Sequence, residues 1–377
     1  MKPDYCDLCD RIDPNLSNRE NGRILGVSES TIRRHKKDDH NSATLHGMTL
    51  RDPETGSWYK YDVEKATPKW PVIQPAAPVK VEVSEIPPKP ARNGLKMSLK
   101  CGDTQIGFRV LEDGTTEEFH DQRAMDLVVE VARREQPDSI VILGDFLDLP
   151  SQGRWAQEAA FAKTTQMSLD TGYKWLASLR AVAPYAEIVL IEGNHDKRLQ
   201  GFIETNAVSA FGLRRAQLPQ EWPVMSLQNL LRLDELNIKY YDAYPAATHW
   251  DSPHVRNIHG TRANSRGSTT AQYAQELPHI STWSGHSHRA EITYKSVLGA
   301  YGEKIESFSA NPGALCKTDG TVPGYNAATH ANGSSAKIVE DWQQGFGVMY
   351  YTDDEAWPFV YRIENGRTIY NGEVLVT

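Results

Sequence analysis

Short apolar runs that end at a glycine and a polar residue dominate the hydrophobic pattern of this chain. Residues 140–143 (IVIL) run into Gly144, and residues 188–191 (IVLI) lead to Gly193. Short unbroken β-branched runs predict strands of a parallel sheet, which is buried on both faces. The apolar spacing of residues 122–134 predicts a helix packed on that sheet. The pattern therefore predicts an α/β fold.

A residue of a type that binds metals follows each such run. The stretches are CGDTQ at 101–105, GDFLD at 144–148, GNHD at 193–196, HG at 259–260 and GHSH at 285–288. A glycine lets the backbone turn sharply, so the polar side chain projects from the strand's carboxyl end, where open α/β sheets bind ligands. Carboxylate, amide and imidazole ligands without thiolate suit Mn²⁺, Zn²⁺ or Fe better than Ca²⁺. Two such cations, roughly 3.5–4 Å apart, clamp the oxygens of an in-line displacement at phosphorus.

In order and composition the five motifs resemble the calcineurin-like metallophosphoesterase family, which includes nucleases and many phosphodiesterases. The resemblance spans roughly residues 95–377 and implies a four-layer α/β/β/α sandwich with two central sheets. It also implies two divalent cations that share one carboxylate. The implied ligands are Asp103, Asp145 and His288 for one cation and Asp145, Asn194, His259 and His286 for the other.

The resemblance also implies a mechanism. His195, oriented by Asp196, protonates the leaving oxygen while a metal-bridging hydroxide attacks the phosphorus. A late element of the family, which closes the core near the site, is similar to the Asn311-Pro312-Gly313 turn.

One position departs from the family pattern, because Gln105 stands where the family usually has histidine. Its carbonyl oxygen either binds the first cation or hydrogen-bonds a water molecule on it. A neutral amide is a weaker and harder ligand than imidazole, so we expect the first cation to bind loosely or Mn²⁺ to be favoured over Zn²⁺.

Each motif by itself has an ordinary explanation. A lone histidine is more often a hydrogen-bonded core or surface residue than a ligand, and GDFLD alone is compatible with a plain strand-to-loop turn. The joint occurrence of the motifs in the family's order favours the metal site. A degenerate site that binds metal but does little chemistry stays open.

A second functional signal lies near the N-terminus. The Ser-x-x-Glu capping box from Ser17 to Glu20 predicts a helix that stops at Gly26, and a second helix is expected to begin at Ser30. The pattern resembles a helix-turn-helix, whose second helix enters the DNA major groove. The apolar residues expected to pack between the two helices are Ile24, Leu25, Val27 and Ile32.

The charge of this segment favours contact with phosphate. Residues 16–37 contain six Lys or Arg against two Glu. The hydroxyl groups expected to reach base edges or phosphates belong to Ser28, Ser30 and Thr31, and the side chains expected to neutralise the DNA backbone belong to Arg33, Arg34, Lys36 and Lys37. A solvated basic helix in a small protein-binding module is the alternative.

We expect three parts along the chain of 377 residues: a helix-turn-helix domain at 1–65, a linker at 66–94 and the metallophosphoesterase domain at 95–377. Seven prolines between Ala66 and Asn93 favour an extended, semi-rigid tether. Residues 44–63 are compatible with a hairpin that forms a wing beside the two helices.

The four cysteines are too few and too scattered for a disulfide framework, so we expect reduced thiols. Cys6 and Cys9 with His35 and His40 permit a small zinc site. The gap between the two pairs is longer than in a zinc finger, where roughly 12–15 residues are usual.

The net charge of −8 lies entirely in residues 41–377, because residues 1–40 hold eight basic and eight acidic side chains. An acidic catalytic domain needs help to approach a polyanion, and a tethered DNA-binding module supplies it by raising the effective concentration of the substrate. No apolar run approaches a membrane span, and no signal-peptide core is present. We therefore expect a cytoplasmic protein, in the host cytoplasm if a bacteriophage encodes it, as the arrangement suggests.

Basic residues after the motifs are candidates for phosphate contact. Arg154 follows the GDFLD motif, next to Trp155, which is suited to stacking on a base or to anchoring a core. The other candidates are Lys197, Arg198, Arg262 and Arg266.

The sequence thus predicts a metal-dependent nuclease or phosphodiesterase that a helix-turn-helix delivers to DNA, with Mn²⁺ as the favoured metal. Two alternatives remain: a phosphatase or phosphodiesterase that acts on a small nucleotide or a protein phosphate, and a DNA-binding regulator whose phosphoesterase fold is weakly active.

Overall fold

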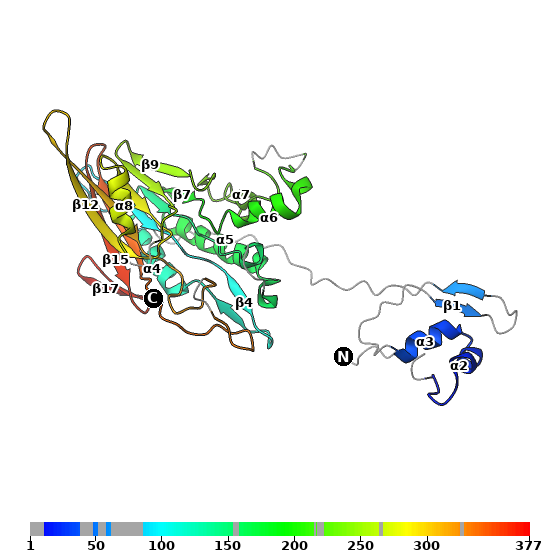
Figure 1. Cartoon of the computed structure of the whole chain (residues 1–377). Coiled ribbons are helices and arrows are strands. Elements are labelled where there is room, and N and C mark those ends of the chain that lie inside the picture. Colours follow the sequence, from blue (N-terminus) through cyan, green and yellow to red (C-terminus); the bar gives the residue numbers. More distant parts are fainter. Residues whose placement is uncertain are drawn as a thin grey trace. The chain divides into compact units, whose positions relative to one another are not determined.

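The computed structural model describes residues 11–37, 48–51, 58–61, 86–153, 158–214, 216, 222–263, 267–324 and 328–377. The chain divides into two compact units, Met1–Pro75 and Ala76–Thr377 (Figure 1). Their boundary falls within the segment that the prolines mark as a linker.

The first unit contains the two expected helices, α2 (Asn18–Leu25) and α3 (Glu29–Lys37). Ser17 and Glu20 form the predicted capping box, and Gly26 ends α2 with a left-handed φ of 70°. Between the helices Val27 and Ile32 are buried, 5% and 0% exposed.

The predicted packing of Ile24 is wrong, because its side chain is 66% exposed. The polar Asn21 takes an interior position on α2 instead. Its amide nitrogen donates to the carbonyl oxygens of Asp13 (2.8 Å) and Leu16 (3.2 Å), so backbone groups of the preceding turn satisfy it. Strands β1 (Met48–Arg51) and β2 (Trp58–Tyr61) pair antiparallel as the expected hairpin.

The first sheet of the second unit has the strand order β15-β14-β3-β6-β7-β8. Its parallel strands are β3 (Lys96–Cys101), β6 (Ser139–Ile142), β7 (Glu187–Ile191) and β8 (Ile238–Tyr241). The antiparallel strands are β14 (Gln344–Tyr351) and β15 (Ala356–Ile363). The strands predicted from the IVIL and IVLI runs are therefore confirmed as neighbours, β6 and β7.

The second sheet has the strand order β12-β13-β11-β10-β9. Its strands are β9 (Thr248–Ser252), β10 (Val255–Ile258), β11 (Ser281–Ser284), β12 (Ala290–Leu298) and β13 (Lys304–Pro312). Strands β10, β11 and β13 run parallel, and β9 and β12 are the antiparallel edges. Strands β10 and β11 end at the HG and GHSH motifs.

Two apolar cores separate the layers. One core joins the first sheet to helices α4 (Gln122–Glu135) and α5 (Thr165–Val182). The other lies between the two sheets, where Val141 and Val189 of the first sheet pack with Trp283 and Phe308 of the second. Helix α8 (Thr269–Glu276) lies along the second sheet, and its Thr270 hydroxyl donates to Glu291 of β12 at 2.9 Å (Figure 1). The expected α/β/β/α sandwich is confirmed.

Smaller elements complete the second unit. They are the hairpins β4 (Phe108–Val110) with β5 (Thr116–Glu118) and β16 (Arg367–Tyr370) with β17 (Glu373–Val376), the helices α6 (Arg198–Asn206) and α7 (Leu227–Leu230), and the 3₁₀ turns η1 (Pro150–Gln152), η2 (Ala159–Phe161) and η3 (Val208–Ala210). No helix in the described part of the chain is both long and apolar enough to cross a bilayer.

The last part of the predicted linker is attached to the second unit. Lys89 forms an ion pair with Asp138 at 2.6 Å, and Arg92 donates to the carbonyl oxygens of Glu135 and Gln136 at the end of α4. The last part of the predicted linker therefore packs on the second unit, and the limits of the linker stay a prediction.

A buried ion pair connects the two sheets. Lys100 of β3 and Asp251 of β9 lie 2.6 Å apart, and their side chains are 0% and 1% exposed. Burial lowers the pKa of the Lys100 ammonium group, and the neighbouring Asp251 carboxylate partly opposes this effect. Asn257 of β10 also donates to Asp251, at 2.7 Å, so the carboxylate is well satisfied as long as Lys100 is present.

We expect Lys100→Met to lower the free energy of unfolding by about 3–5 kcal/mol, because it leaves the Asp251 charge buried without its partner. Urea unfolding measures the loss. The double variant Lys100→Met/Asp251→Asn removes both charges and is expected to recover part of it. A single variant as stable as the wild type would show that the pair does not hold the sheets together.

Candidate metal centre

The five motifs meet where the carboxyl ends of the two sheets face each other. Backbone hydrogen bonds join their loops directly: Asp103 N donates to Gly144 O at 3.0 Å, and Gln105 N donates to Asp145 O at 2.9 Å. In the second sheet Gly285 N donates to His259 O, also at 3.0 Å. The motifs, which are far apart in the sequence, therefore lie close together in the fold.

Five of the polar residues at this place have a left-handed backbone. They are Asp103 (φ 49°), Gln105 (φ 47°), Asp145 (φ 47°), His286 (φ 70°) and His288 (φ 55°). Non-glycine residues adopt this conformation at a cost of order 1–3 kcal/mol each, and such residues cluster at functional sites. The strain turns the side chains inward from the strand ends.

Two glycines allow the loops to approach. A Cβ on Gly144, whose φ is 88°, would lie 2.6 Å from His259 Nδ1, and a Cβ on Gly193 would lie 2.2 Å from Asp145 N. Any side chain at either position would push the ligand-bearing loops apart.

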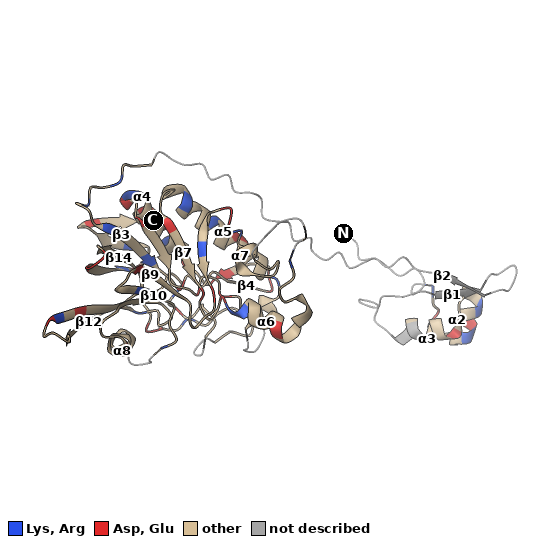
Figure 2. Ribbon diagram, turned by 90° about the horizontal axis from the view of Figure 1, so that it is seen from above, with Lys and Arg blue, Asp and Glu red and all other residues tan. Residues whose placement is uncertain are grey.

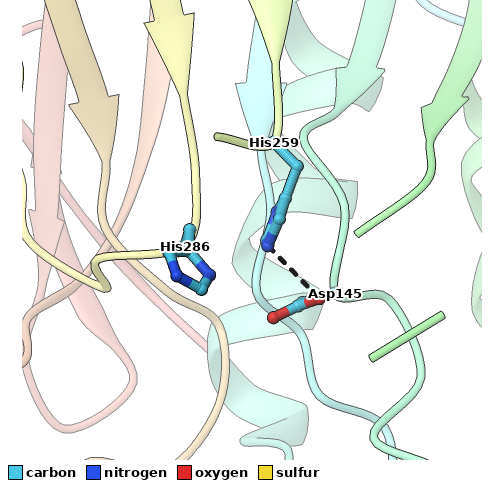
Figure 3. Close-up of side chains that lie close together, drawn as sticks. All are labelled: Asp145, His259 and His286. Carbon is cyan, nitrogen blue, oxygen red and sulfur yellow. Dashed lines mark ion pairs between the residues drawn. The ribbon is translucent and has the colours of Figure 1, made fainter. Parts of the chain in front are cut away.

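Asp145, His259 and His286 form one group of converging side chains (Figure 3). One ligand atom of each lies within 4.8 Å of the others, and His259 Nε2 is 3.3 Å from Asp145 Oδ1. Asn194 Oδ1 is 3.0 Å from the same imidazole nitrogen. These four residues make up the set proposed for one cation.

Asp103, Asp145 and His288 form the second group under the same 4.8 Å limit. His288 Nε2 lies 3.3 Å from Asp103 Oδ1, and Asp103 also accepts the backbone N–H of His286 at 2.9 Å. Asp145 belongs to both groups, as a bridging carboxylate requires. The structure thus brings all the proposed ligands together, while metal binding by them stays a prediction.

The donor set fits a cation. His259 Nδ1 lies 2.7 Å from the carbonyl oxygen of Leu143, so Nδ1 carries the ring proton in the neutral imidazole and the Nε2 lone pair faces inward. That lone pair faces two further acceptors, Asn194 Oδ1 and Asp145 Oδ1. Three acceptors that converge on one point are stabilised by a positive ion.

The pKa values show how strongly the site attracts positive charge. Burial lowers the pKa of His259, but the Asp145 carboxylate outweighs this effect and raises it to about 9. Burial likewise opposes ionisation of Asp145, yet His259 and His195 hold its pKa well below the usual range. Burial and the charge on His259 lower the pKa of His286 to about 4, which leaves its imidazole free to bind a metal. Divalent cations would replace the proton on His259.

Gln105 is part of the site. Its side-chain nitrogen lies 3.3 Å from His288 Nε2. Its carbonyl oxygen is buried and has no hydrogen-bond partner among the described residues. An unsatisfied buried acceptor beside a proposed ligand fits both alternatives, a direct bond to the cation and a bond to its water.

The expected orientation of His195 by Asp196 is wrong. His195 Nδ1 contacts the carboxylate of Asp148, the last residue of the GDFLD motif. The Asp196 carboxylate accepts three backbone N–H groups instead, from Phe146 (3.2 Å), Leu147 (3.0 Å) and Gly193 (2.9 Å). Asp196 therefore joins the loop of the GNHD motif to the loop of the GDFLD motif. The only sequence signal for Asp148 is its place in a motif with two aspartates.

The site has a buried floor and a partly exposed mouth. The floor consists of Asp103, Gln105, Asp145, His259 and His288, all at most 5% exposed. Asn194, His195 and His286 are half-buried. A substrate phosphate would therefore approach from the side of these three residues.

The structure describes the other candidate residues only in part. Arg154 and Arg266 lie outside the described residues, as do Trp155 and the Cys6, Cys9 and His40 of the possible zinc site. In the first unit the Ser28 hydroxyl contacts those of Ser30 (2.9 Å) and Thr31 (2.7 Å), and Arg33 pairs with Glu29 at 3.3 Å. Only the backbone is described at Arg34, Lys36 and Lys37, so the DNA contacts stay a prediction.

Comparison with known proteins agrees with this geometry. The sequence profile of the calcineurin-like phosphoesterase family matches residues 99–315, which contain all five motifs. The chain belongs to this family. Membership implies hydrolysis of a phosphoester and binding of divalent metals, for which the two side-chain groups provide possible sites.

The Gene 54 proteins of Mycobacterium phages D29 and L5 are relatives of this chain. Each is 26% identical over 260 residues, which are 68% of this chain and 93% of the relative. Two similar solved structures are a vacuolar protein sorting 29 from Cryptosporidium parvum (13% identity, TM-score 0.32, 75% of this chain and 97% of that one) and the phosphoesterase Yfce from E. coli (12%, 0.28, 70% and 98%).

We expect Gln105→His to raise the affinity of the first cation about tenfold or more, because imidazole is a better ligand than a neutral amide. Calorimetric titration of the metal-free protein with Mn²⁺ and Zn²⁺ measures the change. Unchanged affinity would place Gln105 beside a water molecule rather than on the metal.

We expect Asp196→Asn to lower the free energy of unfolding by about 2–3 kcal/mol, because an amide nitrogen would face backbone donors that now bind a carboxylate. Asp148→Asn is the matched variant, expected to reduce turnover on unactivated diesters with a smaller loss of stability. Chemical unfolding and turnover of both variants test the reassignment. A larger loss of stability in Asp148→Asn together with a larger loss of turnover in Asp196→Asn would show that Asp196 orients His195.

Proposed function

We propose that this protein is a metal-dependent phosphodiesterase that cleaves DNA. The observation that carries the catalytic part is the Asp145 carboxylate, which both groups of ligand side chains share, with His195 beside it. The DNA-directed part rests on the basic two-helix segment, residues 16–37, near the other end of the chain.

The two groups described above would each hold one cation, with Asp145 between them. When bound, the cations supply positive charge for the phosphoryl oxygens and activation of the attacking water. Mn²⁺ suits a set of carboxylate, amide and imidazole ligands, and the amide of Gln105 favours it over Zn²⁺.

His195 is the proposed general acid. The Asp148 carboxylate holds its Nδ1, so the opposite nitrogen, Nε2, points into the site, 3.8 Å from Asp145 Oδ2. In this position Nε2 would donate a proton to the departing oxygen. Asp148 supports that role by fixing the orientation of the ring.

The choice of DNA rests on the arrangement of the chain. The helices of the first unit lie where the sequence predicts them, and residues 16–37 contain six basic against two acidic residues. In the second unit Lys and Arg are scattered among Asp and Glu (Figure 2). A tethered unit with this basic segment would bring the catalytic unit to a polyanion by effective concentration. The phage relatives support action in a host cytoplasm.

A second candidate function has one specific observation in its favour. The substitution of glutamine for the usual histidine at Gln105 weakens the first metal site, as expected of a DNA-binding protein whose hydrolysis is residual.

The decisive experiment is Mn²⁺-dependent cleavage of labelled single- and double-stranded DNA, run beside bis(p-nitrophenyl) phosphate. We expect the wild type to cleave DNA. Asp145→Asn should lose activity and bound metal together, because both cations lose their shared ligand; metal content is measured by elemental analysis. An Asp145→Asn variant with full activity would overturn the two-metal proposal.

A chain that starts at Ala76 separates the two parts of the proposal. It should hydrolyse the small diester like the full chain but cleave DNA more slowly, with a weaker dependence on salt. Equal DNA cleavage by both chains would remove the delivery role from the first unit. Hydrolysis of the small diester alone would indicate a small phosphoester as substrate, and DNA binding without any hydrolysis would favour the second candidate.

A further inference from the structure

Arg198, the first residue of α6, lies at the mouth of the metal centre. Its Nη1 donates to the Asp148 carbonyl oxygen at 2.5 Å and to the Asp148 carboxylate at 3.0 Å. Its Nη2 lies 3.0 Å from His195 Nε2. The guanidinium is thus anchored at one nitrogen and presents the other to the proposed general acid.

The other described basic residues near the motifs are engaged elsewhere. Lys197 lies 3.8 Å from Glu192, Arg262 pairs with Glu276, and Arg289 pairs with Asp341 at 2.7 Å. Of the phosphate-contact candidates that the structure describes, Arg198 is the one whose side chain touches both His195 and Asp148. The Arg198 side chain is 17% exposed while that of Asp148 is fully buried, so part of the Arg198 side chain is open to solvent.

The contact between Arg198 and His195 leaves donor capacity on the guanidinium. Arginine is always protonated and only donates hydrogen bonds, so His195 Nε2 accepts from Nη2. Nη2 carries a second N–H group, which can donate to an acceptor of the substrate in the same place.

A phosphoryl oxygen is the acceptor that matches this donor. The planar guanidinium fork binds phosphate oxygens through short, charge-assisted hydrogen bonds. With Nη1 held by Asp148, a small rotation of Nη2 away from His195 suffices, so little side-chain entropy is lost on binding.

We propose that Arg198 binds a phosphoryl oxygen of the substrate and that Asp148 anchors both Arg198 and His195 for the same reaction. This inference rests on the proposed phosphoester hydrolysis and is independent of whether DNA is the substrate. Arg198 is a substrate-binding residue, and Asp148 is a positioning residue that couples phosphate binding to proton donation.

The test compares Arg198→Met and Arg198→Lys with the wild type, in the full chain loaded with Mn²⁺. Arg133→Met, which removes an arginine paired with Glu130 on α4, is the matched control. The first readout is the dissociation constant for inorganic phosphate, measured by calorimetry. We expect about 10- to 100-fold weaker binding in Arg198→Met, partial recovery in Arg198→Lys and no change in the control.

The second readout is hydrolysis of bis(p-nitrophenyl) phosphate, whose leaving group needs no proton. His195→Ala should be spared on this substrate. Arg198→Met should be impaired on this substrate as well. It should raise KM more than it lowers kcat, because it removes a contact that binds the substrate. Added guanidinium ion should restore part of the activity.

The outcomes separate the proposals. Unchanged phosphate affinity in Arg198→Met, or an Arg198→Met variant spared like His195→Ala, would overturn the inference and leave Arg198 as a support of His195. A wild type that hydrolyses the small diester but not DNA would defeat only the DNA-directed function. A metal-loaded wild type that binds no phosphate would defeat the Arg198 proposal whatever its activity. Thermal unfolding and metal content of each variant identify any loss that is due to misfolding.

Discussion

The burial of the Asp145 carboxylate between two sheets is the constraint on which the site depends. An isolated charge in such a place is costly, so its surroundings must be positive or must donate hydrogen bonds. The backbone N–H of His195 donates to it at 2.8 Å, and His259 lies on its other side. The loops around it accept left-handed backbone strain in order to face it. Cations at its centre would stabilise such an arrangement.

The fold holds the two halves of the site in register. One sheet contributes Asp103, Asp145 and Asn194, and the other contributes His259, His286 and His288. Any slip between the sheets would separate the ligands, so the apolar core between them and the Lys100–Asp251 pair have a direct effect on the site. Asn311 adds a local brace, because its amide donates to Gly285 O (2.8 Å) and Ser287 Oγ (3.0 Å).

Local signals explain what the sequence could predict. An apolar run followed by glycine identifies a strand end wherever it occurs, so the positions of the ligand residues on strand ends followed from the sequence. The capping box of Ser17 and Glu20 is also a local signal, and it was enough to locate the start of α2. The partner of His195 could not be predicted, because Asp148 and Asp196 are both aspartates in motif loops and only the path of those loops distinguishes them. Ile24 was misplaced because Asn21, with acceptors in the preceding turn, fills the interior position.

Asp148 shows how one buried carboxylate can link binding to chemistry. It contacts His195 through one oxygen, which also accepts from Arg198, and its second oxygen is buried without a partner among the described residues. The imidazole N–H and the guanidinium therefore share one acceptor oxygen. When a phosphate takes the place of His195 as the acceptor of Arg198 Nη2, Asp148 would still hold both the guanidinium and the imidazole ring. The group that binds the phosphate and the group that faces the leaving oxygen would then keep a fixed geometry relative to each other.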